Sequence, residues 1–346
     1  MDYRKTDANV NRACEGVRVL EDTVRFDLNR EDLTRECRLL RHDLRTLFAP
    51  RMAQLISSRD SEADVGVPVS RTAADDGRCG LTSVIAANSK RIQEALRVLE
   101  ESLKGNGFYE EAKKAEALRF RSYTLEKKVT AAVLRRLPEG LYGITAEKFS
   151  NGKGNVRSVR EMIDAGIRVI QYREKYRTMK EKAAEAKEIR KITADAGVVF
   201  IVNDHPDLAL LCEADGVHIG QDDWNPEDVR RIMGDTAVIG LSTHNPDQAQ
   251  VAMRCDIDYI GCGPIFQTFT KDDVCAPVGL DYLNYVSQNV TLPYVAIGGI
   301  KLNNIDEVLK YPVKHIALVS EIVGADNMKA MVAALNRKIE EYGRNQ

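Results

Sequence analysis

The chain lacks the features that mark membrane-spanning, secreted and zinc-thiolate proteins. None of its apolar runs approaches the roughly 18 residues that a spanning helix needs, and the run from Gly197 to Val202 is typical of the longest. The first residues, MDYRKTDANVNR, are polar and contain no signal-peptide apolar core. The seven cysteines are odd in number and include no CxxC pair, which indicates reduced thiols and no zinc site. We therefore expect a cytoplasmic protein that does not enter a membrane.

An excess of charge of either sign is also absent. Fifty Lys and Arg stand against 52 Asp and Glu, which leaves a formal net charge of -2. Nothing in the overall charge therefore favours a nucleic-acid partner or an anionic membrane surface. Hydrophobic residues make up 44% of the chain, an ordinary value for a folded globular protein. A length of 346 residues indicates two domains.

Residues 1–136 follow the period of amphipathic helices. Between Asn88 and Lys104, apolar residues recur three or four positions apart, which places them on one face of a helix. Residues 31–57 and 108–136 have the same pattern, and the second ends at the breaker sequence LPEG. We predict an all-helical N-terminal domain over residues 1–136, followed by a second domain over 137–346.

The N-terminal domain contains an internal repeat. The sequence NVNRACEGVRVLED, which starts at Asn9, matches NSKRIQEALRVLEE, which starts at Asn88. Two copies predict a pseudo-symmetric pair of helical hairpins, since a solenoid would need three or more. The shared Asn, Arg and Glu residues lie near three-residue spacing and could form one polar face in each copy.

The second domain predicts a parallel (β/α)8 barrel of the TIM type. Eight short apolar runs alternate with helix-patterned stretches, and continuous apolar runs are typical of parallel strands buried on both faces. The eight runs cover residues 141–145, 168–173, 198–204, 216–221, 238–243, 259–265, 294–300 and 315–320. An open doubly wound sheet is the alternative, but the GxGxxG that favours it is absent.

Several polar residues follow the strands without an obvious structural task. Proline after His205, Asn225 and Asn245 is typical of the first helical position, so these three residues are the expected helix caps. Asp204, Asp223 and Ser242 are then left over at the carboxyl ends of strands, where barrel enzymes carry their chemistry.

The two aspartates, with Asn203 beside one of them, predict a magnesium site. Magnesium takes one or two carboxylates together with phosphate oxygens and water. Arg173 and Lys175 lie two residues apart, on one side of an extended chain, and could clamp a polyanion. A solvated surface charge run and a structural carboxylate pair are the alternatives.

The last three strands predict a monophosphate site. The loop after the sixth strand contains hydroxyl groups and Lys271 and is long enough to act as a lid. Gly298 and Gly299 follow the seventh strand and Val319 and Ser320 the eighth, which is the usual monophosphate position in this fold. His218 and His315 are expected in the packed core. His244 and Trp224 stay unassigned.

No nucleophile or general base stands out, which favours a transfer in which diphosphate leaves and a phosphorylated molecule attacks.

The chain resembles thiamine phosphate synthase in segments that occur in the family's order across residues 138–346. These are QYREK (171–175), VND (202–204), GVHIGQDD (216–223), GLS (240–242), GPIFQTFTK (263–271), AIGGI (296–300) and VS (319–320).

The resemblance implies a transferase that joins hydroxymethylpyrimidine diphosphate to a thiazole phosphate, giving thiamine phosphate and diphosphate by a dissociative mechanism. It implies that Mg2+ is held by Asp204 and Asp223, and that Arg173, Lys175, Lys271 and Ser242 act in catalysis. The implied substrate contacts are Gln171, Tyr172, Arg173, Glu174, Lys175, Asn203, Ser242, Thr268, Thr270, Lys271, Gly299, Val319 and Ser320.

Two alternatives stay open. A thiazole tautomerase resembles the synthase on the same barrel, but it has no use for a diphosphate clamp. The helical extension resembles the hydroxymethylpyrimidine phosphate kinase-like domain fused to some bacterial synthases, which would make a multifunctional enzyme that uses ATP. It contains no GxxxxGK[ST] loop, and the competing interpretation is a non-catalytic interaction module that forms a homo-oligomer.

Overall fold

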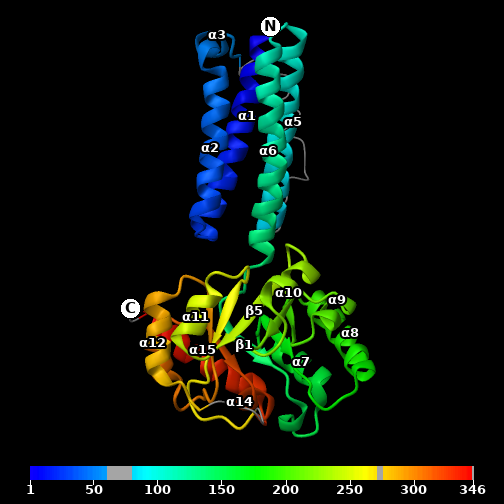
Figure 1. The fold of residues 1–346 in the computed structure, drawn as a ribbon, viewed down its shortest axis with the longest axis vertical. Coiled ribbons are helices and arrows are strands. Elements are labelled where there is room, and N and C mark those ends of the chain that lie inside the picture. The colour runs from blue at the N-terminus through cyan, green and yellow to red at the C-terminus, as the bar shows by residue number, and fades with distance from the viewer. Residues whose placement is uncertain (61–79, 271–275, 345–346) are drawn as a thin grey trace. The chain divides into compact units, whose positions relative to one another are not determined.

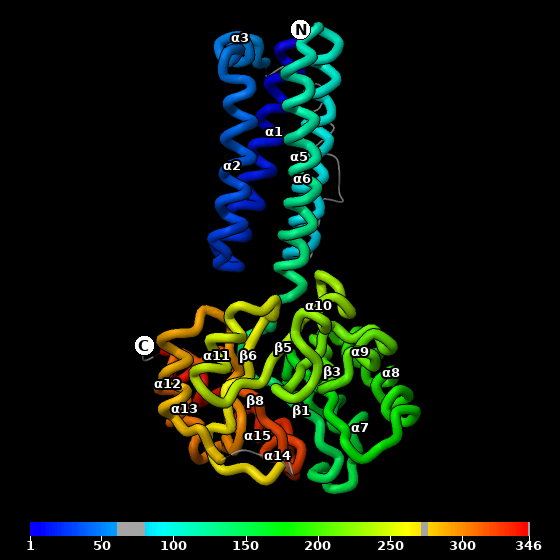
Figure 2. The backbone as a smooth tube through the Cα atoms, in the orientation of Figure 1, coloured from blue at the N-terminus to red at the C-terminus, as the bar shows by residue number. Residues whose placement is uncertain are grey.

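The computed structural model describes residues 1–60, 80–270 and 276–344. The chain divides into two compact units, Met1–Leu134 and Arg135–Gln346, which are called here the helical unit and the barrel unit. Figure 1 shows their elements as ribbons and Figure 2 traces their backbone. Among the described residues, no helix is both long enough and apolar enough to span a membrane.

The described residues of the helical unit form helices and the turns between them, as the sequence period predicts. Its elements are α1 (Tyr3–Asp22), η1 (Thr23–Asp27), α2 (Glu31–Phe48), η2 (Ala49–Arg51), α3 (Met52–Ser57), α5 (Gly80–Gly105) and α6 (Tyr109–Leu134). The apolar face of each long helix packs into one core, which includes Leu20, Leu44, Leu96 and Leu125. Residues 58–80 are mostly small and polar and contain glycine, which predicts a mobile loop. Most of that range (61–79) lies outside the described residues.

The two copies of the repeat lie on α1 and α5, the first helix of each hairpin. The helices approach closely at Gly16, where an added Cβ would lie 2.7 Å from Ile92 Cγ1 and 3.1 Å from the carbonyl oxygen of Asn88. Asn9 and Asn88 are buried, and each side chain donates to the carbonyl four residues earlier in its own helix, at 2.8 Å. Within the predicted polar face of each copy, these asparagines are therefore buried and bonded to their own helices.

Each hairpin contains a buried glutamate at the equivalent position of the repeat. Glu21 and Glu100 are both 0% exposed. Glu21 pairs with Arg41 of α2 at 2.7 Å, and Glu100 pairs with Arg119 of α6 at 3.0 Å. Because a buried charge is costly unless it is paired, the repeated carboxylate ties the two helices of its hairpin together.

The barrel unit is a closed parallel barrel of eight strands in sequential order, which confirms the predicted fold and excludes an open sheet. The strands are β1 (Gly140–Ile144), β2 (Val169–Tyr172), β3 (Val199–Asn203), β4 (Gly216–Ile219), β5 (Val238–Thr243), β6 (Tyr259–Cys262), β7 (Tyr294–Ile297) and β8 (His315–Leu318). The surrounding helical segments are η3 (Glu147–Phe149), α7 (Gly154–Asp164), α8 (Met179–Asp195), α9 (Pro206–Leu211), α10 (Pro226–Met233), α11 (Pro246–Ala252), α12 (Gly279–Asn289), α13 (Ile305–Leu309), α14 (Ser320–Val323) and α15 (Met328–Arg344).

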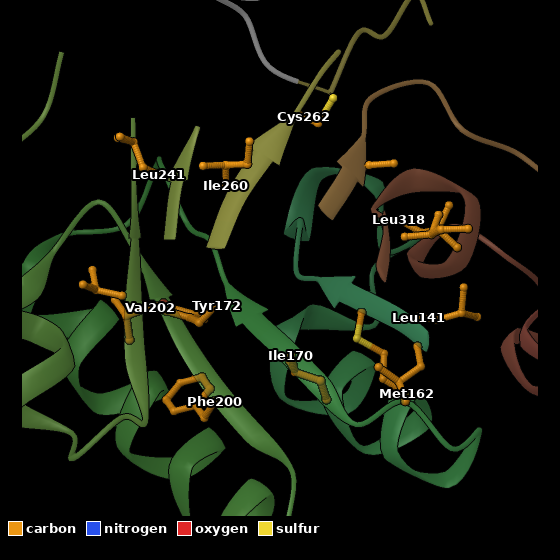
Figure 3. Close-up of a cluster of buried hydrophobic side chains, with 14 of the residues drawn as sticks. Leu141, Met162, Ile170, Tyr172, Phe200, Val202, Leu241, Ile260, Cys262 and Leu318 are labelled. Carbon is orange, nitrogen blue, oxygen red and sulfur yellow. The ribbon is translucent and has the colours of Figure 1, made fainter. Parts of the chain in front are cut away.

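Strand alternation divides the side chains of the barrel between two cores. One set, which includes Ile170, Tyr172 and Phe200, packs between the strands and the outer helices (Figure 3). The other set, which includes Tyr142 and Tyr259, forms a second cluster from seven of the strands, on the opposite face. This alternation decides which of the residues after each strand reach the barrel mouth.

The expected helix caps are confirmed. His205, Asn225 and Asn245 occupy the N-cap positions before Pro206, Pro226 and Pro246. Asn225 accepts from the backbone N–H of Glu227 at 3.0 Å, and Asn245 accepts from that of Gln248 at 2.9 Å. Asp204, Asp223 and Ser242 are therefore not needed as caps of these helices.

Candidate active site

A cavity of about 840 Å³ opens at the carboxyl ends of the barrel strands. Residues from every strand or the loop that follows it contribute to its wall. The predicted site residues that line it are Gln171, Arg173, Lys175, Asn203, Asp204, Asp223, Ser242, Thr268, Thr270, Gly299, Val319 and Ser320. Lys271 lies outside the described residues.

Two residues predicted to bind substrate do not line this cavity. Tyr172 points into the outer core (Figure 3), where its hydroxyl donates to Glu185 Oε2 at 2.7 Å. Glu174 accepts from Asn155 Nδ2 at 3.1 Å and from the backbone N–H of Tyr176 at 2.9 Å. Neither residue lines the cavity for the same physical reason, since successive side chains of an extended chain point to opposite faces.

The structure explains how Arg173 and Lys175 are presented to the cavity. Thr145, which follows β1 and is fully buried, accepts from the Arg173 backbone N–H at 2.8 Å and donates to the Arg173 carbonyl oxygen at 3.2 Å. Arg173 is itself only 9% exposed. Sequence analysis did not identify Thr145, although its place directly after a strand was the available signal.

The predicted metal ligands come from the loops after β3 and β4. Asp204 has a φ of +63°, a left-handed conformation that costs a non-glycine residue roughly 1–2 kcal/mol. Its backbone N–H donates to the carbonyl oxygen of His218 at 2.8 Å, which holds this geometry. Asp223 Oδ2 accepts from the backbone N–H of Gly220 at 2.7 Å.

These ligands fit magnesium better than a softer metal. Both are carboxylates, and the described residues contain no group of three or more His, Cys, Asp and Glu side chains placed to hold a metal. A cation held here therefore needs water and ligand oxygens to complete its coordination. Magnesium is commonly bound in this way, through one or two carboxylates and substrate phosphates.

The opposite side of the cavity is shaped by glycine. Gly298 and Gly299 have φ values of +96° and +66°, and an added Cβ at Gly299 would lie 2.5 Å from the carbonyl oxygen of Gln267. The loop after β6 therefore packs directly on the backbone after β7. In that loop, Thr268 Oγ1 lies 3.1 Å from Thr270 Oγ1, and both threonines line the same cavity as Gly299.

The histidines only partly follow the expectation of a packed core. His315 is buried, and burial lowers its pKa from 6.5 to about 4. His218 instead is half-buried and lines the cavity. Its Nδ1 lies 3.0 Å from Tyr259 Oη and its Nε2 lies 2.9 Å from Ser242 Oγ. His244 also lines the cavity, whereas Trp224 is 55% exposed and does not.

A closed eight-stranded barrel with a polar cavity at the carboxyl ends of its strands defines a (β/α)8-barrel enzyme. The family described as thiamine monophosphate synthase matches residues 141–322, which is more than half of the chain. The chain belongs to this family, whose members are transferases.

Known relatives cover either the barrel unit or the whole chain. The thiamine-phosphate synthase of Pelotomaculum thermopropionicum is 58% identical over 199 residues, which are 58% of this chain and 91% of that protein. The thiamine-phosphate synthase of Nostoc punctiforme is 36% identical over 343 residues, 97% of this chain and 94% of that protein. A solved structure of thiamine phosphate pyrophosphorylase from Pyrococcus furiosus has a TM-score of 0.55 and 33% identity, and covers 61% of this chain and 98% of that one.

The helical unit has a family of its own. The ThiD2 family matches residues 4–128, so it spans both hairpins and both copies of the repeat. The full-length match to the Nostoc protein shows that the helical unit and the barrel also occur together in a relative.

Proposed function

We propose that the barrel unit condenses 4-amino-2-methyl-5-hydroxymethylpyrimidine diphosphate with 4-methyl-5-(2-phosphoethyl)thiazole, or its carboxylated form. The products are thiamine phosphate and diphosphate, and the carboxylated thiazole also releases its carboxyl group as CO2. One observation supports this proposal beyond family membership: the residues proposed for a diphosphate clamp and those proposed for a monophosphate site line one cavity. Its volume of about 840 Å³ lies in the range of small-molecule sites.

The chain's own residues stabilise a departing diphosphate. Arg173 and Lys175 supply fixed positive charge, and Lys271 is proposed to add to it. The C–O bond to diphosphate breaks first and leaves a pyrimidine methylene cation, which the thiazole nitrogen then attacks to form the C–N bond. Such a path needs oriented charges more than a general base. Magnesium, held by Asp204 and Asp223 when bound, supplies further charge neutralisation.

The second substrate is proposed to bind at the glycine-shaped side of the cavity. Gly299, Val319 and Ser320 offer backbone and hydroxyl groups to its phosphate, and Thr268 and Thr270 offer two more hydroxyls from the loop after β6. Gln171, Asn203 and Ser242 are proposed to orient the pyrimidine. A tautomerase would bind only the thiazole phosphate, so the presence of Lys175, Asp204 and Asp223 in the same cavity favours the synthase.

An assay of the full-length protein with magnesium, thiazole phosphate and pyrimidine diphosphate tests this function. We expect thiamine phosphate to form, to disappear when magnesium is chelated, and to be lost in Asp204→Ala. Asp207→Ala is the matched control, because this exposed aspartate three residues later does not line the cavity. If the folded protein makes no product, the tautomerase replaces the synthase as the proposed function.

For the helical unit we propose phosphorylation of the pyrimidine monophosphate by ATP, which would supply the diphosphate substrate of the barrel. The match to the ThiD2 family and the resemblance of this extension to a pyrimidine phosphate kinase support it. Any phosphate contacts must come from exposed residues of the repeat such as Arg12, Glu15, Arg91 and Glu94, since Asn9 and Asn88 are bonded within their own helices.

The barrel-inactive Asp204→Ala variant tests this second activity in the full chain. Given ATP and the pyrimidine monophosphate, it should accumulate the pyrimidine diphosphate, and no diphosphate should form without ATP. If none forms with ATP and the protein is a stable oligomer, the helical unit is instead an oligomerisation module.

A further inference from the structure

A network of polar side chains that do not line the cavity contacts the loop after β2, which carries Arg173 and Lys175. Asn155 of α7 lies at its centre and is 1% exposed. Asn155 Nδ2 donates to Glu174 Oε2 at 3.1 Å and to Glu185 Oε2 at 3.0 Å. One amide group therefore joins a carboxylate of the loop to a carboxylate of α8. This set is called here the anchor network, and its members are Glu147, Asn155, Tyr172, Glu174, Arg177 and Glu185.

The other members of the anchor network hold the far end of the loop. Tyr172 Oη donates to Glu185 Oε2 at 2.7 Å. Arg177 donates from Nε and Nη2 to the carboxylate of Glu147 at 2.9 and 2.7 Å, and its Nη1 lies 3.2 Å from Glu185 Oε1. Arg177, two residues after Lys175, is therefore tied to both η3 and α8.

The backbone is also fixed on both sides of Lys175. Glu174 Oε1 accepts from the backbone N–H of Tyr176 at 2.9 Å, which closes a turn around Lys175. The backbone of Arg173 is bonded through its N–H and its carbonyl oxygen to Thr145. Because side chains alternate along an extended chain, Arg173 and Lys175 line the cavity while Glu174 joins the anchor network.

Two features of the anchor network are unfavourable for stability by themselves. Asn155 Oδ1 is buried and has no hydrogen-bond partner, and a buried acceptor without a donor destabilises the folded state. Glu174 is 9% exposed and forms no ion pair with any residue that the structure describes, although burying a charge is costly unless it is paired. Departures of this kind are typical of residues that support a functional site. The amide of Asn155 is thus explained by the two carboxylates that its N–H groups hold together.

We infer that Asn155 and Glu185 are positioning residues for diphosphate binding, and that through the anchor network they hold Arg173 and Lys175 toward the cavity before a ligand arrives. This inference rests on the proposed synthase function. Charges that are already in place stabilise a leaving group without having to be reorganised during the reaction. Without Asn155, the carboxylates of Glu174 and Glu185 lose their shared donor and repel each other, so the loop moves with Glu174.

Titration calorimetry of the full-length protein with magnesium and inorganic diphosphate tests the inference. Asn155→Ala should weaken diphosphate binding by about tenfold or more, since a displacement of about 1 Å in a positioned group can reduce its effect by about 100-fold. The value of kcat/KM for the pyrimidine diphosphate should fall with it. The KM for thiazole phosphate should not change, because the residues proposed to bind its phosphate follow β6, β7 and β8.

Ser158→Ala is the matched control for Asn155→Ala. Ser158 is also a buried polar residue of α7, but its hydroxyl donates to the carbonyl oxygen of Gly154 in the same helix at 2.8 Å. Its variant should bind diphosphate like the unmodified protein. Unchanged diphosphate binding in Asn155→Ala overturns the inference. An equal loss in Ser158→Ala, or an equal loss of thiazole phosphate binding in Asn155→Ala, also overturns it.

A second substitution tests the repulsion between the two carboxylates. Glu185→Gln, added to Asn155→Ala, removes one of the two charges and supplies an amide that can donate to Glu174. Diphosphate binding should partly recover in this double variant, and the absence of any recovery contradicts the role of Glu185.

Tyr172→Phe perturbs the anchor network without changing a charge. It removes one donor to Glu185 and should weaken diphosphate binding, though by less than Asn155→Ala. Tyr282→Phe is its control, because the Tyr282 hydroxyl is also buried and donates to Thr243 Oγ1 at 2.8 Å outside the network. A loss of the same size in both tyrosine variants would overturn the inference.

Binding of diphosphate separates this inference from the proposed function, since it requires no turnover. If the unmodified protein binds magnesium diphosphate but makes no thiamine phosphate, the proposed function fails, and the binding measurements on the variants still decide the inference. If the unmodified protein makes thiamine phosphate and all the variants bind diphosphate equally well, the inference fails and the proposed function stands.

Discussion

The buried ion clusters of the helical unit differ from the charged residues at the barrel mouth. In the helical unit, the buried carboxylates of Glu21 and Glu100 are each surrounded by three basic side chains within 3.5 Å. At the barrel mouth, Lys175 and Asp223 are exposed to the cavity. Neither forms an ion pair with any residue that the structure describes.

This difference distinguishes charged residues that stabilise the fold from charged residues that are available to bind a ligand. A carboxylate whose partners all lie in its own unit is satisfied without any substrate. Charges of both signs that face one cavity without neutralising each other are satisfied only when a ligand and a cation arrive. Substitutions at four positions test or sharpen this comparison.

The largest effect is expected for Lys175→Ala at the barrel mouth. Loss of a charge that stabilises the leaving group should lower turnover by about 10²–10³-fold, while the thermal unfolding midpoint changes little. Steady-state kinetics and a thermal melt measure the two. Lys180→Ala removes an exposed lysine of α8 and should change neither. Near-normal turnover in both Lys175→Ala and Lys271→Ala would contradict the proposed leaving-group contacts.

Glu100→Gln should have the opposite profile. It leaves Arg119 and Lys104 without their buried carboxylate, which should lower the free energy of unfolding of the helical unit by about 3 kcal/mol. Condensation of supplied pyrimidine diphosphate should be unchanged. Urea unfolding followed by circular dichroism measures the loss. A variant as stable as the unmodified protein would show that this ion cluster does not hold the hairpin.

The same cluster predicts a pH dependence. Burial raises the pKa of Glu100, but the hydrogen bonds from Lys104 and Arg119 lower it by more. The pKa of Glu100 therefore lies below its ordinary value of 4.5. A carboxyl group with a lowered pKa in the folded state stabilises the protein above its unfolded pKa and loses that contribution as the pH falls through its folded pKa. The difference in free energy of unfolding between the unmodified protein and Glu100→Gln should therefore be largest near neutral pH and should shrink as the pH falls into the acid range.

A smaller effect on stability is expected at Asp204, which is both a proposed metal ligand and a residue with a strained backbone conformation. Glycine tolerates a positive φ and alanine does not, so Asp204→Gly should be more stable than Asp204→Ala by about 1 kcal/mol. Both should lack synthase activity because both lack the carboxylate. Urea midpoints of the two variants decide the point, and equal midpoints would mean that the left-handed conformation of Asp204 carries no strain.

The smallest effect is expected for Arg35→Ala. Arg35 pairs with Glu31 at 2.7 Å, but the two side chains are 71% and 87% exposed, and exposed pairs contribute little to stability. The urea midpoint of the helical unit should not move measurably. A clear shift would mean that the contrast between buried and exposed pairs in this unit is weaker than the structure indicates.

Much of the site could be predicted from sequence because strand ends in a barrel converge. Once eight strands were recognised, residues such as Arg173, Asp204 and Ser242 had to meet at one rim. The prolines after His205, Asn225 and Asn245 identified these three residues as helix caps. Asp204 and Asp223 were therefore not needed as caps and could be predicted as site residues.

Sequence patterns did not decide in which direction a single side chain points. Tyr172 and Glu174 lie within a motif of site residues, yet alternation turns both away from the cavity. His218 sits inside a strand pattern like His315, and no periodicity distinguishes a histidine that faces the barrel mouth from one buried at the start of a strand. Asn9 and Asn88 share the spacing of an exposed face, yet they donate to their own helices.

Local patterns in the sequence by themselves determined the element order, the helical repeat, the eight-stranded barrel and the rim where polar residues gather, because these follow from apolar periodicity and turn residues along a short stretch of chain. Tertiary structure alone decided the partners of Glu21 and Glu100 and the hydrogen bonds that link Gln171, Tyr142, Tyr259, His218 and Ser242. These hydrogen bonds join five strands. Contacts between residues far apart in sequence depend on strand register and side-chain packing, which no local pattern specifies.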